Sequence, residues 1–401
     1  MTRARLLIGW PSGDGDLFFV TRFHSPRPCA VLELADERLA LVEPGEFELA
    51  ARSVPTDDVI AAPVGAWLAS NSEPASASAF AWLVALIRAR GVDRLEIPPD
   101  FPYACACVLE RAGLALTIGS RPFFPERIRK TDELLREARR VAATLTDALE
   151  LARHRLSSCR IVDSALLDGA RALDARALAS ELTAWLSARG IDAPRVIVSC
   201  GMLTAEPHVP GEGALAPDQP ILVDLFGRCR TSGLWGDVAR TFVRGRASDA
   251  LRRGNAALAD ARRSAFEAIR DGASVSAPHS AAERALAAAG FETTLSGESA
   301  VGLVHATGHG IGFDLHEPPY LSRTGAEIAA QSAERGAPRG EDRGHDDAQL
   351  APFSRLETGQ LIALEPGLTL PTIGAVRHEE LVVVRGEGAE RLSPHEPPFE
   401  I

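Results

Sequence analysis

The sequence predicts a mixed α/β (α+β) protein with a small α/β N-terminal domain, residues 1–122, and a larger C-terminal domain, residues 129–401. Three observations predict this. Short strand-like and helix-like segments alternate up to about residue 120, a polar stretch with prolines follows, and the remainder holds two similar strand pairs that each follow helices. A chain of 401 residues is also of the length expected for two domains.

The N-terminal segments show clear turn and stop signals. Residues 29–34 and Arg38–Val42 predict a hairpin around Asp36. Residues 80–90 predict a helix that ends at Gly91, and Arg94–Ile97 predicts the strand after it. The polar stretch at 120–126 is interpreted as a linker between the domains.

Four amphipathic helices are predicted in the C-terminal domain, and their apolar stripes indicate core packing. The first has acidic residues in its first turn and the stripe Leu134, Ala138, Val141, Leu145, Leu149 and Ala152. The second carries Leu178, Leu182, Trp185 and Leu186 and ends at Gly190. The third covers about residues 251–270. The fourth is expected to begin with the capping box Ser280-x-x-Glu283 and to end at Gly290.

Two strand pairs follow these helices, which suggests a duplicated helix-and-hairpin unit. They cover residues 220–226 with 235–243, and 361–370 with 375–384. Residues 323–350 interrupt the second copy with a polar run rich in Ala, Gly, Arg and Asp. We expect a surface loop there that either covers the site entrance or is a passive insertion.

The composition excludes several classes of partner. A net charge of −11 argues against nucleic acids and anionic membranes, which both call for basic surfaces. No apolar run approaches the roughly 18 residues of a membrane span, and the apolar stretch after Met1 is too short for a signal peptide. The six cysteines form no CxxC pair, as is typical of free thiols in a reducing compartment. We therefore expect a cytoplasmic protein.

Each strand pair holds an acidic residue on both arms, within apolar surroundings. The first pair contains Asp224 and Asp237, and the second contains Glu365 and Glu379 at nearly the same spacing. Like charges that face each other destabilise a sheet, and a buried unpaired carboxylate costs several kcal/mol. One such acid could be a satisfied core residue, but four in two matching copies require a compensating cation.

A histidine in a glycine-rich segment is the fifth candidate ligand. His309 lies in the sequence GHGIG, with His305 and His316 nearby, and its flanking glycines would let the backbone approach an ion. Four carboxylates and one imidazole form an oxygen-rich set that suits manganese, cobalt or iron better than zinc. The set is too large for one ion, so we expect two divalent ions that share bridging carboxylates, manganese or cobalt before iron or zinc.

Several motifs in order resemble the pita-bread metallopeptidases, the clan of Xaa-Pro dipeptidase, aminopeptidase P and methionine aminopeptidase. They are TGHGIG at 307–312 with HEP at 316–318, LEPG at 364–367, VRHE at 376–379 and DVARTF at 237–242. The resemblance covers about residues 129–384, and residues 129–141 resemble the clan's first helix. It implies a C-terminal pita-bread fold and a creatinase-like N-terminal domain, as in the proline-specific members.

The resemblance also implies roles for individual residues. Asp224 would bind one metal through both oxygens and His309 the other, Asp237 and Glu379 would bridge the ions, and Glu365 would complete the set. The ions would activate a bridging water that attacks the peptide carbonyl. His316 would stabilise the tetrahedral intermediate. His208 and His305 match histidines of the substrate pocket, and Arg377 is a further candidate for substrate binding.

The resemblance implies a dinuclear-metal peptidase that cleaves the N-terminal amide bond of short peptides, with Xaa-Pro substrates and a homodimer expected. The chain departs from the family at His378 and Glu380, in a longer loop between Asp224 and Asp237, and in residues 323–350. A creatinase-like or other non-peptide amide hydrolase and a binding-only module remain the alternatives. All five metal-ligand residues of the family pattern are present in this sequence, which argues against the binding-only module.

Overall fold

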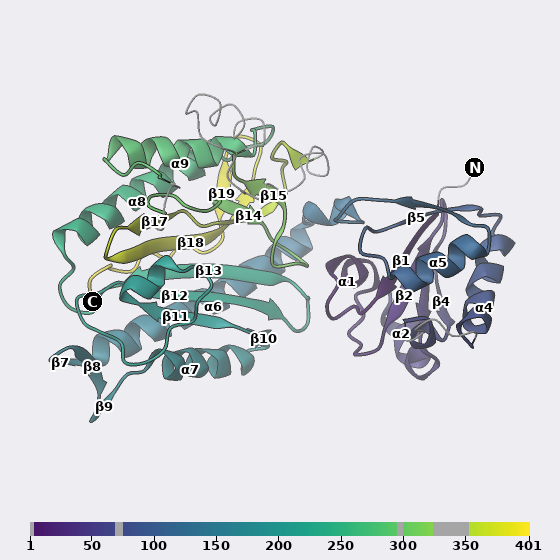
Figure 1. The fold of residues 1–401 in the computed structure, drawn as a ribbon, viewed down its shortest axis with the longest axis horizontal. Coiled ribbons are helices and arrows are strands. Elements are labelled where there is room, and N and C mark those ends of the chain that lie inside the picture. The colour runs from purple at the N-terminus through teal and green to yellow at the C-terminus, as the bar shows by residue number, and fades with distance from the viewer. Residues whose placement is uncertain (1–3, 69–74, 295–299, 324–352) are drawn as a thin grey trace. The chain divides into compact units, whose positions relative to one another are not determined.

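The computed structural model describes residues 4–68, 75–294, 300–323 and 353–401, which form a mixed α/β protein as predicted (Figure 1). The chain divides into two compact units, Met1–Arg127 and Ile128–Ile401. The predicted loop at 323–350 lies outside the described residues except for Arg323. Within the described ranges, no helix combines the length and the apolar character needed to cross a membrane.

The first unit is built on a six-stranded sheet with the order β4-β3-β2-β1-β5-β6. The predicted hairpin is confirmed, because β2 and β3 pair antiparallel around Asp36, while β4, β5 and β6 add parallel strands at the two edges. The strands are β1 Ala4–Gly9, β2 Cys29–Glu33, β3 Arg38–Val42, β4 Asp58–Ala61, β5 Arg94–Ile97 and β6 Ala115–Ile118.

Both faces of this sheet are covered, because successive side chains of a strand point to opposite faces. Leu6 of β1 packs in the cluster beneath α3, α4 and α5, whereas Leu7 packs in the cluster beneath α1 and α2. The helices are α1 Gly15–Thr21, α2 Phe47–Ser53, α3 Val64–Leu68, α4 Ala75–Ala89 and α5 Tyr103–Arg111, with the 3-10 turns η1 Pro44–Glu46 and η2 Pro125–Ile128.

The expected linker at 120–126 is in fact attached to the first unit. Phe123 and Phe124 are buried in its core, and both of their backbone N–H groups donate to the carboxylate of Asp16. Asp16 is fully buried and also pairs with Arg121 and Arg127. Polar and proline-bearing composition suggested a free segment, but the two phenylalanines anchor it.

The second unit is built on a ten-stranded sheet with the order β10-β12-β13-β18-β16-β14-β15, to which β11, β17 and β19 add at the sides. A small separate sheet contains β7, β8 and β9. The strands are β7 Arg160–Val162, β8 Ala165–Asp168, β9 Arg171–Ala172, β10 Ile191–Asp192, β11 Val196–Cys200, β12 Ile221–Cys229, β13 Trp235–Phe242, β14 Gly308–Gly310, β15 Glu317–Leu321, β16 Leu361–Leu364, β17 Gly367–Leu370, β18 Gly374–Val384 and β19 Ala389–Arg391.

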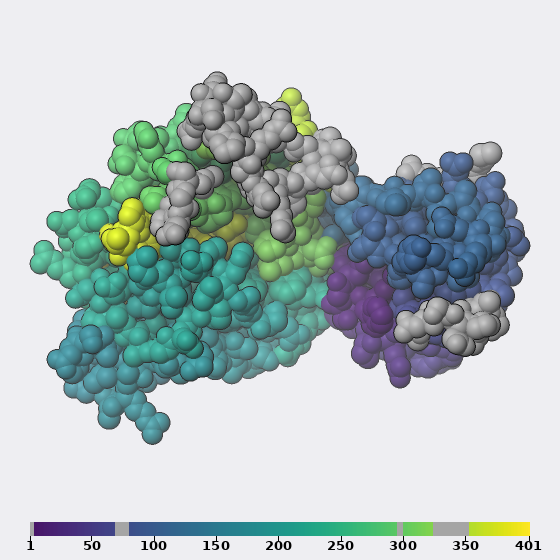
Figure 2. Space-filling view, viewed as in Figure 1, coloured from purple at the N-terminus to yellow at the C-terminus, as the bar shows by residue number. Residues whose placement is uncertain are grey.

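Two helices pack on each half of this sheet, which is the duplication that the sequence predicted. Helices α6 and α7 share a core with β12 and β13, and α8 and α9 share one with β16 and β18 (Figure 1). The green surface of α8 and α9 is part of the exterior in Figure 2. The helices are α6 Asp132–Ser158, α7 Ala175–Ser187, α8 Asp249–Ala268 and α9 Ser276–Ala288, and the 3-10 turn η3 is Gly201–Ala205.

Three details of the prediction were wrong. Helix α9 begins at Ser276 and Ser280 lies inside it, because Pro278 fits the first turn of a helix. Glu283 pairs with Arg323 rather than closing a capping box. The segment 361–370 is two strands, β16 and β17, with Glu365 in the break between them.

Candidate metal centre

Three of the predicted acidic residues come together through the register of the sheet. Asp224 on β12 pairs with Ala239 on β13, and Ala239 pairs in turn with Glu379 on β18. Asp237 lies two residues from Ala239 on the same strand, so its side chain points to the same face. The apolar residues between them, such as Val223 and Val238, point to the helices instead. Alternation along the strands therefore separates an acidic face from the core.

Glu365 and His309 reach the same place from the second half of the sheet. Glu365 lies in the chain between Leu364 and Gly367, and both of these residues pair with β18. Leu364 pairs with Glu380, and Gly367 pairs with Arg377. His309 on β14 pairs with Ala363 on β16. The break between β16 and β17 thus sets Glu365 beside Glu379, although Glu365 is not within a strand as we had expected.

The donor atoms of these residues lie within the reach of a metal ion. Asp237, His309 and Glu379 each offer one ligand atom, and these atoms are all within 4.8 Å of one another. His309 Nε2 is 3.8 Å from Glu365 Oε1. Asp224, Asp237, His309 and Glu379 are each at most 5% exposed, so the cluster is shielded from water.

The acidic residues are poorly compensated by protein groups alone. Burial raises the pKa of Asp224 to about 6, with Arg377 opposing the rise. Burial and then the neighbouring carboxylates raise the pKa of Asp237 and of Glu379 well above their usual values. One oxygen of each of these three residues is buried without a hydrogen-bond partner. Such orphaned oxygens, together with an imidazole, fit divalent cations that prefer oxygen and nitrogen ligands.

His309 is oriented as a metal ligand would be. Its Nδ1 lies 3.0 Å from the carbonyl oxygen of Gly310, and because a carbonyl can only accept, Nδ1 must donate. Burial lowers the pKa of His309 to about 4, so the ring is neutral. The lone pair is then on Nε2, the nitrogen that faces Glu365.

Arg377 is the cation that the structure places against the acidic residues. Its Nη1 donates to Oδ2 of Asp224 over 3.0 Å, and the guanidinium is almost buried. We predicted Arg377 as a substrate-binding residue from its motif. In the structure one nitrogen of the guanidinium contacts Asp224, a candidate metal ligand, and Arg377 also lines the neighbouring pocket, so substrate binding by Arg377 stays a prediction.

The glycines around His309 are required by the neighbouring strands. A Cβ at Gly308 would lie 2.3 Å from the carbonyl oxygen of Ala363, and one at Gly310 would lie 2.3 Å from that of Pro318. We expected these glycines to make room for an ion. They make room for β16 and β15, which hold His309 between them.

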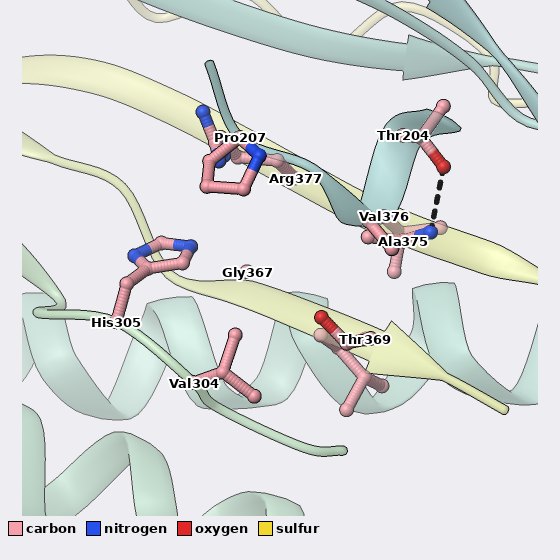
Figure 3. Close-up of a pocket in the computed structure, with 11 residues that line it drawn as sticks. Thr204, Pro207, Val304, His305, Gly367, Thr369, Ala375, Val376 and Arg377 are labelled. Carbon is pink, nitrogen blue, oxygen red and sulfur yellow. Dashed lines mark hydrogen bonds between the residues drawn. The ribbon is translucent and has the colours of Figure 1, made fainter. Parts of the chain in front are cut away.

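A small pocket is drawn in Figure 3, and two of the residues that line it, His305 and Arg377, contact the acidic cluster. Most of its wall is apolar, and His305 and Arg377 supply its charged or titratable groups. His305 Nδ1 is 4.0 Å from Glu365 Oε2, and a Cβ at Gly367 would lie 2.5 Å from His305 Nε2, so only glycine admits this ring. The lining residues are Thr204, Ala205, Pro207, Val304, His305, Gly367, Leu368, Thr369, Ala375, Val376 and Arg377.

The other predicted histidines differ in their placement. The ring of His316 is exposed and contacts His309 edge-on, with ring centroids 4.4 Å apart. His208 is exposed, its carbonyl accepts from Arg195, and its neighbour Pro207 lines the pocket. The prediction that His208 lines the substrate pocket therefore stays a prediction, because His208 is not among the residues that line this pocket.

Sequence reasoning missed two sets of residues around the cluster. Lys130, the single lysine of the sequence, forms a fully buried ion pair with Glu317, the residue after His316. Thr204 lines the pocket and its hydroxyl accepts from the N–H of Ala375 (Figure 3). A lone lysine in an arginine-rich chain was a signal for the first; a threonine in a short turn gave none.

Comparison with known proteins extends the likeness over most of the chain. Residues 133–386 match the profile described as metallopeptidase family M24. A probable dipeptidase PepE of Mycobacterium bovis is 30% identical over 203 residues, which are 50% of this chain and 45% of that protein. The Xaa-Pro dipeptidase of Pyrococcus furiosus is 23% identical over 246 residues, 60% of each chain. The matched region thus spans about half the length of these curated relatives.

Solved structures show the same fold over nearly the whole chain. The Xaa-Pro dipeptidase of Bacillus anthracis superposes with a TM-score of 0.75 at 20% identity and covers 99% of this chain and 95% of its own. The prolidase of Pyrococcus furiosus gives a TM-score of 0.73 at 18% identity, with 98% and 97% covered. The predicted pita-bread fold is confirmed.

Proposed function

Because the chain belongs to metallopeptidase family M24, we propose that it is a dinuclear-metal peptidase that hydrolyses the N-terminal amide bond of short Xaa-Pro peptides. The observation that carries this proposal is the convergence of Asp237, His309 and Glu379, with ligand atoms within 4.8 Å, beside a largely apolar pocket. The relatives named dipeptidase and Xaa-Pro dipeptidase support the substrate class.

The proposed ligands are the five residues that the sequence singled out: Asp224, Asp237, His309, Glu365 and Glu379. Asp237 and Glu379 project from the adjacent strands β13 and β18 and would be the two carboxylates that both ions share. When bound, two divalent ions would supply Lewis acidity and a strongly acidified water. Manganese or cobalt is the proposed metal, because the donor set is rich in carboxylate oxygen.

The remaining groups bind and orient the substrate. His316 is exposed beside His309, so its ring can donate a hydrogen bond to the oxyanion that forms at the scissile carbonyl. His305 and the apolar wall of Pro207, Val304 and Val376 would hold a neutral residue such as proline. The engagement of Arg377 with Asp224 leaves the pocket without a fully free cation, which favours an uncharged side chain there.

A substrate panel tests this proposal. Protein stripped of metal and reloaded with manganese or cobalt is incubated with Xaa-Pro dipeptides, Xaa-Pro tripeptides, matched Xaa-Ala peptides, N-acyl amides that are not peptides, and creatine. Faster cleavage of Xaa-Pro than of Xaa-Ala supports the proposal, and the length series separates a dipeptidase from an aminopeptidase P. Turnover of creatine without peptide cleavage would favour the amidinohydrolase alternative instead.

We also propose a creatinase-like N-terminal domain, a homodimer and a cytoplasmic location. The resemblance to the proline-specific members supports the first two, and free cysteines without a CxxC pair support a reducing compartment. Light scattering at several protein concentrations measures the assembly, and a monomer at all of them would remove the dimer.

A further inference from the structure

The two halves of the second unit are joined at a short seam between β13 and β18. Regular backbone pairing there consists of Ala239 with Glu379 and Arg240 with His378. Within the first half, by contrast, β12 and β13 pair from Ile221 to Arg228 without interruption. Asp237 is on one side of the seam and Glu379 on the other, so the seam determines the distance between them.

Beyond these two pairs, a side chain replaces the backbone ladder. The hydroxyl of Thr241 accepts from the backbone N–H of Arg377 over 2.9 Å and donates to the carbonyl oxygen of the same residue over 3.1 Å. Thr241 is 8% exposed. One buried hydroxyl thus satisfies both the N–H and the carbonyl oxygen of Arg377. Because the hydroxyl lies between the two backbones, it helps to set the distance between β13 and β18 at this position.

Side chains bond the same edge of β18 at other positions as well. Thr204 accepts from the N–H of Ala375 over 2.7 Å (Figure 3), and Ser393 accepts from the N–H of Leu381 over 3.0 Å. Arg240 donates to the carbonyl of Glu379. The position of Thr241 differs from that of Ser393 because its partner, Arg377, carries the guanidinium that contacts Asp224.

We propose that Thr241 is a positioning residue for the metal centre. Through Arg377 it fixes β18 against β13, and so holds Glu379 and Arg377 in place relative to Asp224 and Asp237. The inference rests on the proposed function, since it requires that these acids bind metal. Groups that orient metal ligands without touching the ion typically change metal affinity or activity by about 10–100-fold when they are removed.

A purely structural role makes a different prediction. If Thr241 only adds two buried hydrogen bonds, then its loss lowers the stability of the fold and leaves metal affinity unchanged. Ser393 is a matched control for this role, because it too is buried and bonds the backbone of β18. Its partner Leu381 has an apolar side chain, which cannot hydrogen-bond a candidate ligand as the guanidinium of Arg377 does.

The experiment compares Thr241→Val, which keeps the shape and loses the hydroxyl, with Thr241→Ser, which keeps the hydroxyl, and with Ser393→Ala. Manganese(II) binding to metal-free protein is measured by calorimetry, stability by thermal unfolding in chelator, and kcat and KM with an Xaa-Pro dipeptide. We expect Thr241→Val to bind manganese at least about tenfold more weakly. Its kcat should fall by a larger factor than its KM changes. Thr241→Ser should be close to wild type, and Ser393→Ala should lose stability alone.

Several outcomes would overturn the inference. A Thr241→Val protein that melts at a lower temperature but binds manganese with unchanged affinity would make Thr241 merely structural, and Thr241→Ala decides in the same way if the valine variant does not fold. If Ser393→Ala bound manganese as weakly as Thr241→Val does, the loss of any side-chain hydrogen bond to β18 would weaken metal binding, and Thr241 would have no special role. Wild-type protein that binds manganese but cleaves no Xaa-Pro peptide would refute the proposed substrate and leave the affinity comparison decisive. Wild-type protein that binds neither manganese nor cobalt would refute the metal centre and this inference with it.

Discussion

Arg377 Nη1 donates to Asp224 Oδ2 over 3.0 Å, and this contact joins residues 153 positions apart in the chain. Asp224 belongs to the first half of the large sheet and Arg377 to the second. Burial alone would lower the pKa of Arg377, but the four acidic residues around it raise that pKa above its usual value. The guanidinium therefore stays charged and offsets part of the negative charge of the cluster.

Replacing Arg377 with methionine should destabilise the metal-free protein more than the metal-loaded one. Removal of one partner of a buried ion pair costs about 3–5 kcal/mol, because the other charge is left uncompensated. Bound ions would compensate Asp224 in place of the guanidinium, so the loss should shrink when metal is present. Urea unfolding in chelator and in excess manganese measures both losses.

The control for this variant is Arg139→Met. Arg139 pairs with Glu390 at the surface, where both side chains are more than a third exposed, and such pairs contribute at most about 1 kcal/mol. Equal losses for Arg377→Met with and without manganese would show that Arg377 does not compensate the acidic cluster.

Glu379→Gln should lose metal and activity and yet be more stable than wild type when both are metal-free. Burial and the neighbouring carboxylates raise the pKa of Glu379, which means that its charged form is unfavourable in the folded protein. A neutral amide of the same shape removes that repulsion. Thermal unfolding in chelator and metal analysis test both halves, with the exposed Glu357→Gln as control. A metal-free Glu379→Gln protein that melts below wild type would contradict the account, and Asp237→Ala should lose metal and activity in the same way.

His316→Ala should keep its metal and bind substrate almost normally, while kcat falls by a factor of about 10²–10³. This factor corresponds to roughly 3–4 kcal/mol, which is the usual effect of removing one hydrogen-bond donor aimed at a developing oxyanion. His316 is exposed and contacts His309 edge-on, so it reaches the site without burial in the core. Steady-state kinetics and metal analysis measure this, with the exposed His154→Ala on α6 as control. An unchanged kcat would mean that His316 only packs against its neighbours, and a lost ion would make it a ligand.

Asp16→Asn should destabilise the first unit in a pH-dependent way. Burial alone would raise the pKa of Asp16, but Arg127, the N–H groups of Phe123 and Phe124 and then Arg121 lower it below 3.8. A carboxyl with a lowered folded-state pKa stabilises the fold above its unfolded pKa, and this stability is lost as the pH falls through the folded-state value. The difference from wild type should therefore be constant above about pH 5 and shrink below it.

Urea unfolding at several pH values measures this difference. Asp100→Asn is the matched control, because Asp100 also pairs with Arg121 but is 65% exposed. We expect a loss of about 3–5 kcal/mol for Asp16→Asn at neutral pH, since Arg127 is left buried beside a neutral group. A difference that grows as the pH falls would contradict the assigned direction of the pKa shift.

Much of the fold was predictable because local signals agreed with the final structure. Helix α6 has acidic residues in its first turn and an apolar stripe, and it forms as expected, capped by Thr131. The hairpin of β12 and β13 follows from two apolar segments with a turn between them. The paired acids predicted a common site, and the structure brings Asp237, Glu379 and His309 within reach of one another.

Other features depend on contacts between distant segments, which no local pattern encodes. The pairing of Arg377 with Asp224 and that of Lys130 with Glu317 arise only when the halves of the sheet assemble. Ser280 matched a capping box, but the helix begins one turn earlier, at Ser276, with Pro278 in its first turn. His208 matched a motif position, and the folded turn exposes it while Pro207 faces the pocket.

The central claim is that four carboxylates and His309 hold two ions, and the metal content of the reconstituted protein tests it most directly. Metal-free wild type is reloaded with manganese or cobalt, freed of excess ion by gel filtration, and analysed by mass spectrometry for moles of metal per mole of chain. The account predicts two ions per chain in wild type and a loss of metal in Glu379→Gln. A wild-type protein that retains no ion, or a Glu379→Gln protein with the same content as wild type, would contradict it.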